Sequence, residues 1–246
     1  MVKFAKHHEF PGFSFGALKD HSTSVRPLYF ANFEEFTPEY FQFSFGRDHF
    51  PSAQLMAATR VLILGHSFVH RLHSFIDSSS SPVLTPSLGL EERINVKWRG
   101  IGGRTIAKVL QYDLHIVESF KPQIVVLELG TNDLSHLAPT TVGSSLEDLT
   151  RVLYSRYAVQ RVVVCQTLFR DKNQDFNVNV TLLNKYSSVV ISSLPYAYFW
   201  KHRSLWNSSK TLYLKDGVHL SAFGQVKLYR SIRGAVLHSL RSLNLL

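Results

Sequence analysis

Four short segments of this sequence carry residues that could together perform acyl transfer. The first is GHSF, in which Ser67 directly follows an apolar run that ends at Gly65. The others are RGIGGRT, LELGTND and DGVHLS, which supply glycines, an asparagine and an Asp-x-x-His pair. A serine hydroxyl becomes a nucleophile when a neighbouring imidazole accepts its proton and a carboxylate orients that imidazole. The sequence therefore contains the components of a serine hydrolase.

Three of the segments also have simpler interpretations. The first lacks the second glycine of the G-x-S-x-G nucleophile elbow, which argues against an α/β-hydrolase. RGIGGRT has neither the glycine spacing of a dinucleotide-binding loop nor the G-K-[ST] of a P-loop, and it could be a tight turn. Asn132 could cap a helix instead of donating a hydrogen bond to developing negative charge. Asp216 and His219 stand three residues apart, a spacing that can turn a carboxylate and an imidazole to the same side.

The elements that must position these residues alternate between strands and helices. Apolar β-branched runs occur at 61–64, 94–98, 124–129, 162–168 and, more weakly, 196–200. Helical stretches lie near 69–76, 106–119, 146–157, 180–192 and 222–240. Continuously apolar strands that alternate with helices indicate a parallel sheet covered on both faces. We predict a three-layer α/β/α sandwich with about five strands, whose ligands bind beyond the carboxyl ends of the strands.

The first 58 residues differ from the rest of the chain. They are rich in Phe and Tyr and show no sustained period of two or of 3.6 residues. We predict two parts: an aromatic-rich extension over 1–58, partly disordered or draped over a neighbouring surface, and a catalytic domain over 59–246.

Charge leaves the choice of macromolecular partner open. The formal net charge is +9 at pH 7, which attracts anionic partners such as nucleic acid, phospholipid headgroups or acidic substrates. The basic residues are scattered, and a C-terminal group fits the solvated face of a helix: Lys227, Arg230, Arg233 and Arg241. Charge alone is therefore compatible with nucleic-acid binding without requiring it.

The compartment is expected to be reducing. The single cysteine, Cys165, lies in an apolar run, which predicts a buried thiol and no intrachain disulfide. The N-terminus lacks the apolar stretch of a signal peptide, and no run of residues is long and apolar enough to span a membrane. We expect an intracellular, cytoplasmic protein.

The order of the four segments resembles the SGNH hydrolase superfamily, also called GDSL-type esterases and lipases. The resemblance covers about residues 60–241, and GTND and DGVHL are its most specific parts. It implies a flavodoxin-like SGNH fold and an esterase activity that needs no cofactor. We also expect no metal site, because His66, His70 and His73 have no carboxylate or cysteine partner at ligand spacing. Family members act on acetylated carbohydrates, lysophospholipids, thioesters and small aryl esters. We expect a small-molecule, lipid or carbohydrate substrate with a short, acetyl-like acyl group.

The resemblance also implies a role for each matching residue. Ser67 would be the nucleophile, and its own backbone N–H would be one oxyanion donor. Gly103 would supply a second N–H and Asn132 a side-chain amide. His219 would act as general base and acid, and Asp216 would orient it.

Some features near the four segments stay open. The family's first block is usually Gly-Asp-Ser, so His66 replaces an aspartate that is usually structural, and it could add local positive charge. Arg71 and Arg104 are either solvated or positioned to meet an anionic group of a substrate. Glu128, inside an apolar strand, is predicted to be a buried, hydrogen-bonded carboxylate.

A second function is weighed against the esterase. Esterase domains of this superfamily occur in the first open reading frame of certain non-LTR retrotransposons, and the GHSF variant looks similar to such proteins. The alternative is therefore a nucleic-acid-binding module of retroelement origin, non-catalytic or bifunctional, that uses the basic surface.

Overall fold

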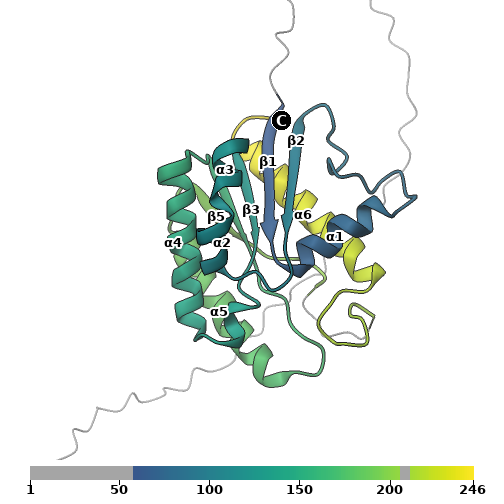
Figure 1. Cartoon of the computed structure of the whole chain (residues 1–246), viewed down its shortest axis with the longest axis vertical. Helices are drawn as coiled ribbons and strands as arrows, with labels where there is room; N and C mark the ends of the chain where they lie inside the picture. Colours follow the sequence, from purple (N-terminus) through teal and green to yellow (C-terminus); the bar gives the residue numbers. More distant parts are fainter. Residues whose placement is uncertain (1–57, 206–210) are drawn as a thin grey trace, which may run out of the picture. The chain divides into compact units, whose positions relative to one another are not determined.

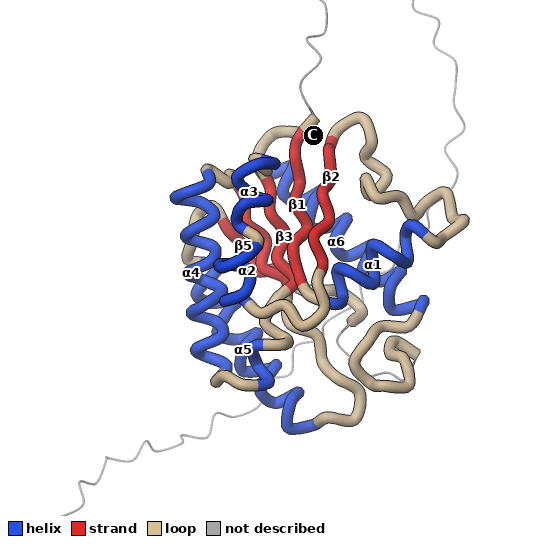
Figure 2. Tube along the Cα trace, viewed as in Figure 1, coloured by secondary structure: helices blue, strands red, loops and turns tan. Residues whose placement is uncertain are grey.

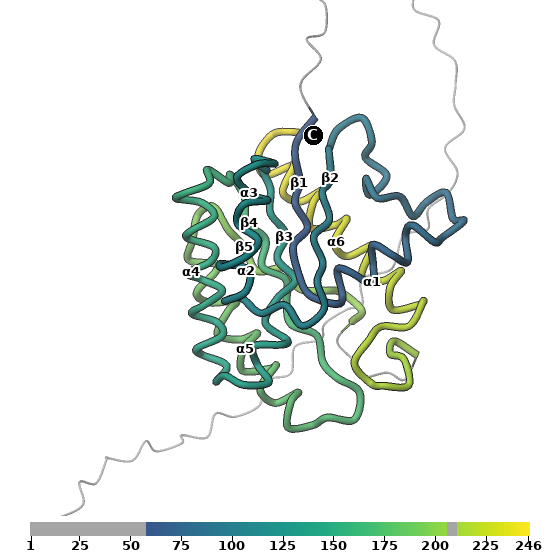
Figure 3. The backbone as a smooth tube through the Cα atoms, in the orientation of Figure 1, coloured from purple at the N-terminus to yellow at the C-terminus, as the bar shows by residue number. Residues whose placement is uncertain are grey.

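The computed structural model describes residues 58–205 and 211–246, so the predicted extension lies, apart from its last residue, outside the described residues. Five strands form one parallel sheet in the order β2-β1-β3-β4-β5 (Figures 2 and 3). Their bounds are β1 (Thr59–Gly65), β2 (Ile94–Gly100), β3 (Ile124–Glu128), β4 (Arg161–Cys165) and β5 (Ala197–Trp200). The predicted parallel sheet is confirmed.

Helices cover both faces of this sheet (Figure 1). Two of them, α1 (Ser67–Asp77) and α6 (Ala222–Ser242), pack on one face. The other face carries α2 (Ile106–Tyr112), α3 (Leu114–Phe120), α4 (Pro139–Tyr157) and α5 (Gln174–Ser192). Alternate side chains of a strand serve the two cores, because successive residues point to opposite faces. Val61 and Ile63 pack with α1 and α6, whereas Leu62 and Leu64 pack on the opposite side.

Several helices differ from the predicted ranges. The helix predicted over 106–119 is broken at Asp113, which ends α2 and precedes α3. α4 begins at Pro139, earlier than predicted, because proline is well suited to the first position of a helix. α5 begins at Gln174, where the side chain of Asn173 accepts a hydrogen bond from the backbone of Phe176. In the described part of the chain, no helix is both long and apolar enough to cross a membrane.

The strand order places a topological switch point between β1 and β3. The connection after β1 leads to α1 on one face, and the chain after β3 leads to α4 on the other. In sheets of this topology, ligands bind where successive connections diverge in this way. Gly65 pairs with Glu128 at this point, and a Cβ on Gly65 would lie 2.5 Å from the Glu128 carbonyl oxygen and 2.6 Å from Val69 Cγ2. The glycine therefore lets α1 start directly on the carboxyl edge of the sheet.

Candidate active site

Ser67 is the first residue of α1, immediately beyond the carboxyl end of β1. It is partly exposed, whereas His66 and Phe68 on either side of it are buried. The His66 side chain caps the helix, because its Nδ1 accepts a hydrogen bond from the Phe68 backbone N–H at 3.4 Å. The buried neighbours fix the turn and so hold the partly exposed serine at the edge where ligands are expected.

His66 is neutral at neutral pH. Its side chain is almost fully buried, and desolvation lowers the pKa of His66 to about 4, although Glu128 opposes this shift. Nearby His219 and Arg170 lower the pKa of His66 further. The expectation that a histidine here could add positive charge is therefore wrong, because burial disfavours the charged form. Its Nε2 has no hydrogen-bond partner among the described residues.

The loop after β2 makes a tight turn with an open outer side. The Arg104 backbone N–H donates to the Ile101 carbonyl at 3.2 Å, and Gly103 has φ of +68°. A turn with positive φ at its third residue favours glycine at that position. A Cβ on Gly103 would meet no atom within 4 Å, so the backbone on this side is free to approach a ligand.

Asn132 lies against the same loop. Its Nδ2 donates a hydrogen bond to the Arg104 carbonyl oxygen at 2.9 Å, and its side chain does not cap the 3-10 turn η1 (Asp133–Ser135). The next residue, Asp133, instead holds the start of α2, because its Oδ1 accepts from the Ile106 backbone N–H at 2.9 Å. Burial raises the pKa of Asp133. One hydrogen of the Asn132 amide is therefore used to fix its orientation, and the other is left for a ligand.

A buried carboxylate holds this loop from behind. Asp113 is 1% exposed, and its Oδ1 accepts hydrogen bonds from Arg99 Nε at 3.1 Å and Arg104 Nη2 at 3.2 Å. Arg104 Nε forms an ion pair with Asp113 Oδ2 at 2.9 Å. Arg104 is thus a structural partner of Asp113, and the sequence analysis missed this cluster. The available signal was an acidic residue in the middle of an apolar helical stretch that follows two arginines.

Asp216 and His219 form a hydrogen-bonded pair in the segment before α6. His219 Nδ1 lies 2.7 Å from Asp216 Oδ2, and Asp216 Oδ1 accepts from the backbone N–H groups of Val218 and His219, each at 2.9 Å. Partial desolvation raises the pKa of Asp216, but these three hydrogen bonds outweigh it and lower the pKa to about 2. The carboxylate is therefore charged at neutral pH and fixes one ring nitrogen of His219.

The His219 ring comes close to the serine segment. Its centroid is 6.4 Å from that of Phe68, in an edge-to-face arrangement. The segment that carries it is held by backbone hydrogen bonds from Leu214 to His219 at 2.7 Å and from Asp171 to Gly217 at 2.7 Å. Within residues 58–205 and 211–246, no hydrogen bond joins the Ser67 hydroxyl to His219. Such contacts often tighten only when substrate is bound.

Beneath this edge lies a buried polar cluster. His202 Nε2 is 3.0 Å from Glu128 Oε2, and His202 Nδ1 is 2.8 Å from Ser231 Oγ. Trp200 Nε1 donates to the same hydroxyl at 3.0 Å. Glu128 is thus a buried, hydrogen-bonded carboxylate, as predicted, whereas nothing in the sequence pointed to His202 as its partner.

The same cluster has the residue types of a metal site. Potential ligand atoms of Glu128, Cys165 and His202 lie within 4.8 Å of one another. The direct bond between Glu128 and His202 already occupies the facing atoms, so the present geometry is that of a hydrogen-bonded pair. Cys165 is a buried free thiol, and burial, with the nearby Glu128, raises its pKa.

Comparison with known proteins identifies relatives of this fold. A family model described as "GDSL-like Lipase/Acylhydrolase family" matches residues 63–227, well over half of the chain. The search of curated proteins found no match to this chain.

Solved structures resemble the chain at low sequence identity. A carbohydrate esterase family 3 protein from Talaromyces cellulolyticus gives a TM-score of 0.55 at 15% identity, covering 75% of this chain and 99% of that chain. An acetylxylan esterase variant from Geobacillus stearothermophilus gives 0.51 at 15% identity, covering 72% and 94%. An acetyl esterase variant with acetate ion gives 0.56 at 14% identity, covering 75% and 99%. These likenesses show the fold.

Proposed function

Because the chain belongs to the GDSL-like lipase/acylhydrolase family, we propose that it is a serine esterase in which Ser67 is the nucleophile. The observation that carries the proposal is the 2.7 Å contact between Asp216 and His219, in a segment whose histidine ring approaches Phe68, next to Ser67. A carboxylate on Nδ1 holds the imidazole in the tautomer whose Nε2 can accept a proton.

The proposed reaction has two steps. In the first, Ser67 Oγ bonds to the ester carbonyl carbon while its proton passes to His219, and the bond to the alcohol breaks as the alcohol oxygen takes that proton. In the second, His219 takes a proton from water, the water oxygen bonds to the acyl carbon, and Ser67 leaves with the proton. Asp216 stabilises the imidazolium in both steps.

The negative charge on the carbonyl oxygen needs donors that are already in place. We assign this role to the backbone N–H groups of Ser67 and Gly103 and to the Asn132 amide. Its support is the fixed orientation of Asn132 against the Arg104 carbonyl and the open face of the Gly103 turn. Preorganised donors lower the barrier because they need no reorganisation during the reaction.

A short acyl group, such as acetyl, suits the proposal best. Structural neighbours include proteins described as an acetyl esterase and an acetylxylan esterase. The family itself limits the substrate to the broader class of esters.

Labelling with a fluorophosphonate probe, followed by hydrolysis of p-nitrophenyl acetate, tests the mechanism. We expect the wild-type protein to be labelled and to hydrolyse the ester. Ser67→Ala should abolish both, because it removes the attacking oxygen, and His219→Ala should lose both nearly completely. Circular dichroism of each variant verifies that it is folded.

Asn132→Ala provides a graded test in the same assay. We expect it to keep the label but to lower kcat by roughly a hundredfold to a thousandfold, the usual effect of losing one oxyanion donor. A folded wild-type protein that takes no label and hydrolyses no ester would refute the proposed mechanism.

A second function is favoured by one feature of α6. A pocket of about 410 Å³ is lined by four cationic side chains, Arg203, Lys227, Arg230 and Arg241, together with Trp200, and no carboxylate of the described residues lines it. A row of cations beside an aromatic ring suits the phosphates and bases of single-stranded nucleic acid. We propose nucleic-acid binding, which would also fit a retroelement origin, as this second function. The salt dependence of RNA binding tests it.

A further inference from the structure

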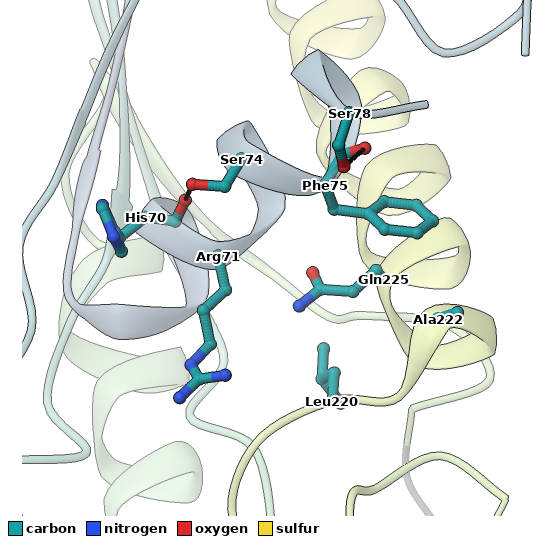
Figure 4. Close-up of a pocket in the computed structure, with 8 residues that line it drawn as sticks. All are labelled: His70, Arg71, Ser74, Phe75, Ser78, Leu220, Ala222 and Gln225. Atoms are coloured by element: carbon teal, nitrogen blue, oxygen red, sulfur yellow. Dashed lines mark hydrogen bonds between the residues drawn. The ribbon is translucent and has the colours of Figure 1, made fainter. Parts of the chain in front are cut away.

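A second hollow lies directly beside the proposed active site, between α1 and the start of α6 (Figure 4). It has a volume of about 450 Å³. On one side it is lined by α1 residues that include Arg71, Ser74 and Phe75, and on the other by Leu220 and Gln225. We refer to it as the α1–α6 groove.

The groove continues from the serine. Residues three and four positions apart share one face of a helix, so the stripe that begins at Ser67 passes through Arg71, Ser74 and Ser78. With a rise of about 1.5 Å per residue, Arg71 stands roughly 6 Å along the helix axis from Ser67. Leu220, on the opposite wall, directly follows His219. A substrate attacked by Ser67 can therefore extend into this groove.

The charge of the groove is positive and uncompensated. Arg71 makes no hydrogen bond or ion pair with any residue of the described chain, and no carboxylate lines the groove. The contrast with Arg99 and Arg104 is informative, because both are bound to Asp113. Figure 4 shows the Arg71 side chain extending from α1, with none of the other labelled side chains against its guanidinium. An arginine presents a planar set of donors that matches a carboxylate or phosphate.

Gln225 adds a polar group that lacks a partner. It is 5% exposed, and its Oε1 has no hydrogen-bond partner among the described residues. In Figure 4 its amide points from α6 toward α1, between Phe75 and Leu220. A buried polar atom left unpaired costs free energy, which a bound ligand could recover by hydrogen bonding.

We propose that the α1–α6 groove binds an anionic group, a carboxylate or a phosphate, on the non-reacting part of the ester substrate. Arg71 pairs with the anion, and Gln225 Oε1 accepts a hydrogen bond from a neighbouring donor group of the substrate. Arg71 is then a specificity residue for the reaction. The inference rests on the proposed esterase function for its turnover readout.

The test compares anionic and neutral esters of similar size. For the acyl side, the pair is p-nitrophenyl hemisuccinate and p-nitrophenyl butyrate; for the alcohol side, it is p-acetoxybenzoate and its methyl ester. The measured quantity is the ratio of kcat/KM for the anionic ester to that for the neutral one. The pair whose ratio depends on Arg71 shows which half of the substrate carries the charge.

We expect Arg71→Ala to lower this ratio by about three- to tenfold, because Arg71 is exposed and solvent weakens its contact with an anion. Arg71→Glu should lower it further, and Arg71→Lys should retain most of it. Arg93→Ala is the matched control, because it removes the same charge from an exposed residue just before β2, at the opposite end of the strand from the site. Its ratio should equal that of the wild type. Ratios that are unchanged in both Arg71→Ala and Arg71→Glu would overturn the proposal.

Binding without turnover separates this inference from the esterase mechanism. Equilibrium dialysis of p-acetoxybenzoate against the Ser67→Ala protein measures occupancy of the groove when no reaction is possible. Weaker binding to the protein that carries both Ser67→Ala and Arg71→Ala supports the proposed anion site in the groove, even if the wild type hydrolyses no ester. Equal binding with and without Arg71, together with active wild-type enzyme, overturns the groove and leaves the esterase standing.

Discussion

The titration of buried His66 contributes to the pH dependence of the free energy of unfolding. In the folded protein its pKa is about 4, and its ordinary value is 6.5. Between these values the unfolded chain binds the proton and the folded one does not, so the free energy of unfolding rises with pH. This stability is fully present above about pH 6.5, is lost as the pH falls toward 4, and amounts to roughly 3 kcal/mol at most.

His66→Asn tests this dependence. Asparagine can cap α1 with its side-chain oxygen and does not titrate. We expect the free energy of unfolding, from urea denaturation between pH 7 and pH 4.5, to fall less steeply in the variant, by up to about 1.4 kcal/mol per pH unit. Other histidines contribute equally to both proteins, so the difference belongs to His66. Parallel curves would show that burial does not perturb His66.

The β2–α2 loop is positioned by elements that lie behind it. Asp113 joins the end of β2, through Arg99, to the loop itself, through Arg104, whose carbonyl in turn orients Asn132. Removing one partner of a buried ion pair destabilises a protein by about 3 kcal/mol or more, because the other charge is left buried and unpaired. Asp113→Ala would therefore damage the fold as a whole and could not report on catalysis.

Arg104→Lys is the informative variant of this cluster. Lysine keeps the charge beside Asp113 but cannot reproduce the forked contacts of the guanidinium. We expect kcat for p-nitrophenyl acetate to fall by about tenfold with little change in KM, since a shifted Arg104 carbonyl would leave the Asn132 amide misaligned for the transition state. Steady-state kinetics with a thermal melt measure both effects. Arg151→Lys, at an exposed position of α4, is the control and should leave kcat unchanged. A variant that loses stability but keeps kcat would show that Arg104 does not position the loop.

The sequence predicted the elements well because their patterns are local. Continuously apolar strands, and the order of the four segments, are enough to indicate the sheet and the edge where the segments meet. Contacts with residues outside an element were missed: Asp113, at the break in a helical stretch, is held by Arg99 and Arg104. His202 was missed for the same reason, since its partner Glu128 is 74 positions away.

At the scale of the whole molecule, the net charge is +9, and the basic residues differ in whether a carboxylate lies beside them. Arg99 and Arg104 share the single carboxylate of Asp113, whereas no carboxylate of the described residues lines the pocket at the stripe along α6 that includes Lys227, Arg230 and Arg241. The sequence predicts a solvated helix face at these residues, whereas in the structure Trp200, at the end of β5, and Arg203 line a pocket with them. Only the fold brings these segments together.

If this stripe binds single-stranded nucleic acid, its affinity should depend on salt in proportion to the phosphates it contacts. Each neutralised phosphate contributes about 0.7 to the slope of log K against log salt concentration. The double change Arg230→Ala and Arg241→Ala should therefore reduce the slope by about 1.4, measured by fluorescence anisotropy of a labelled single-stranded RNA. Arg93→Ala with Lys185→Ala removes the same charge elsewhere and should leave the slope nearly unchanged. Equal slopes in the two double variants would mean that the binding follows net charge alone, and that the α6 pocket is not a nucleic-acid site.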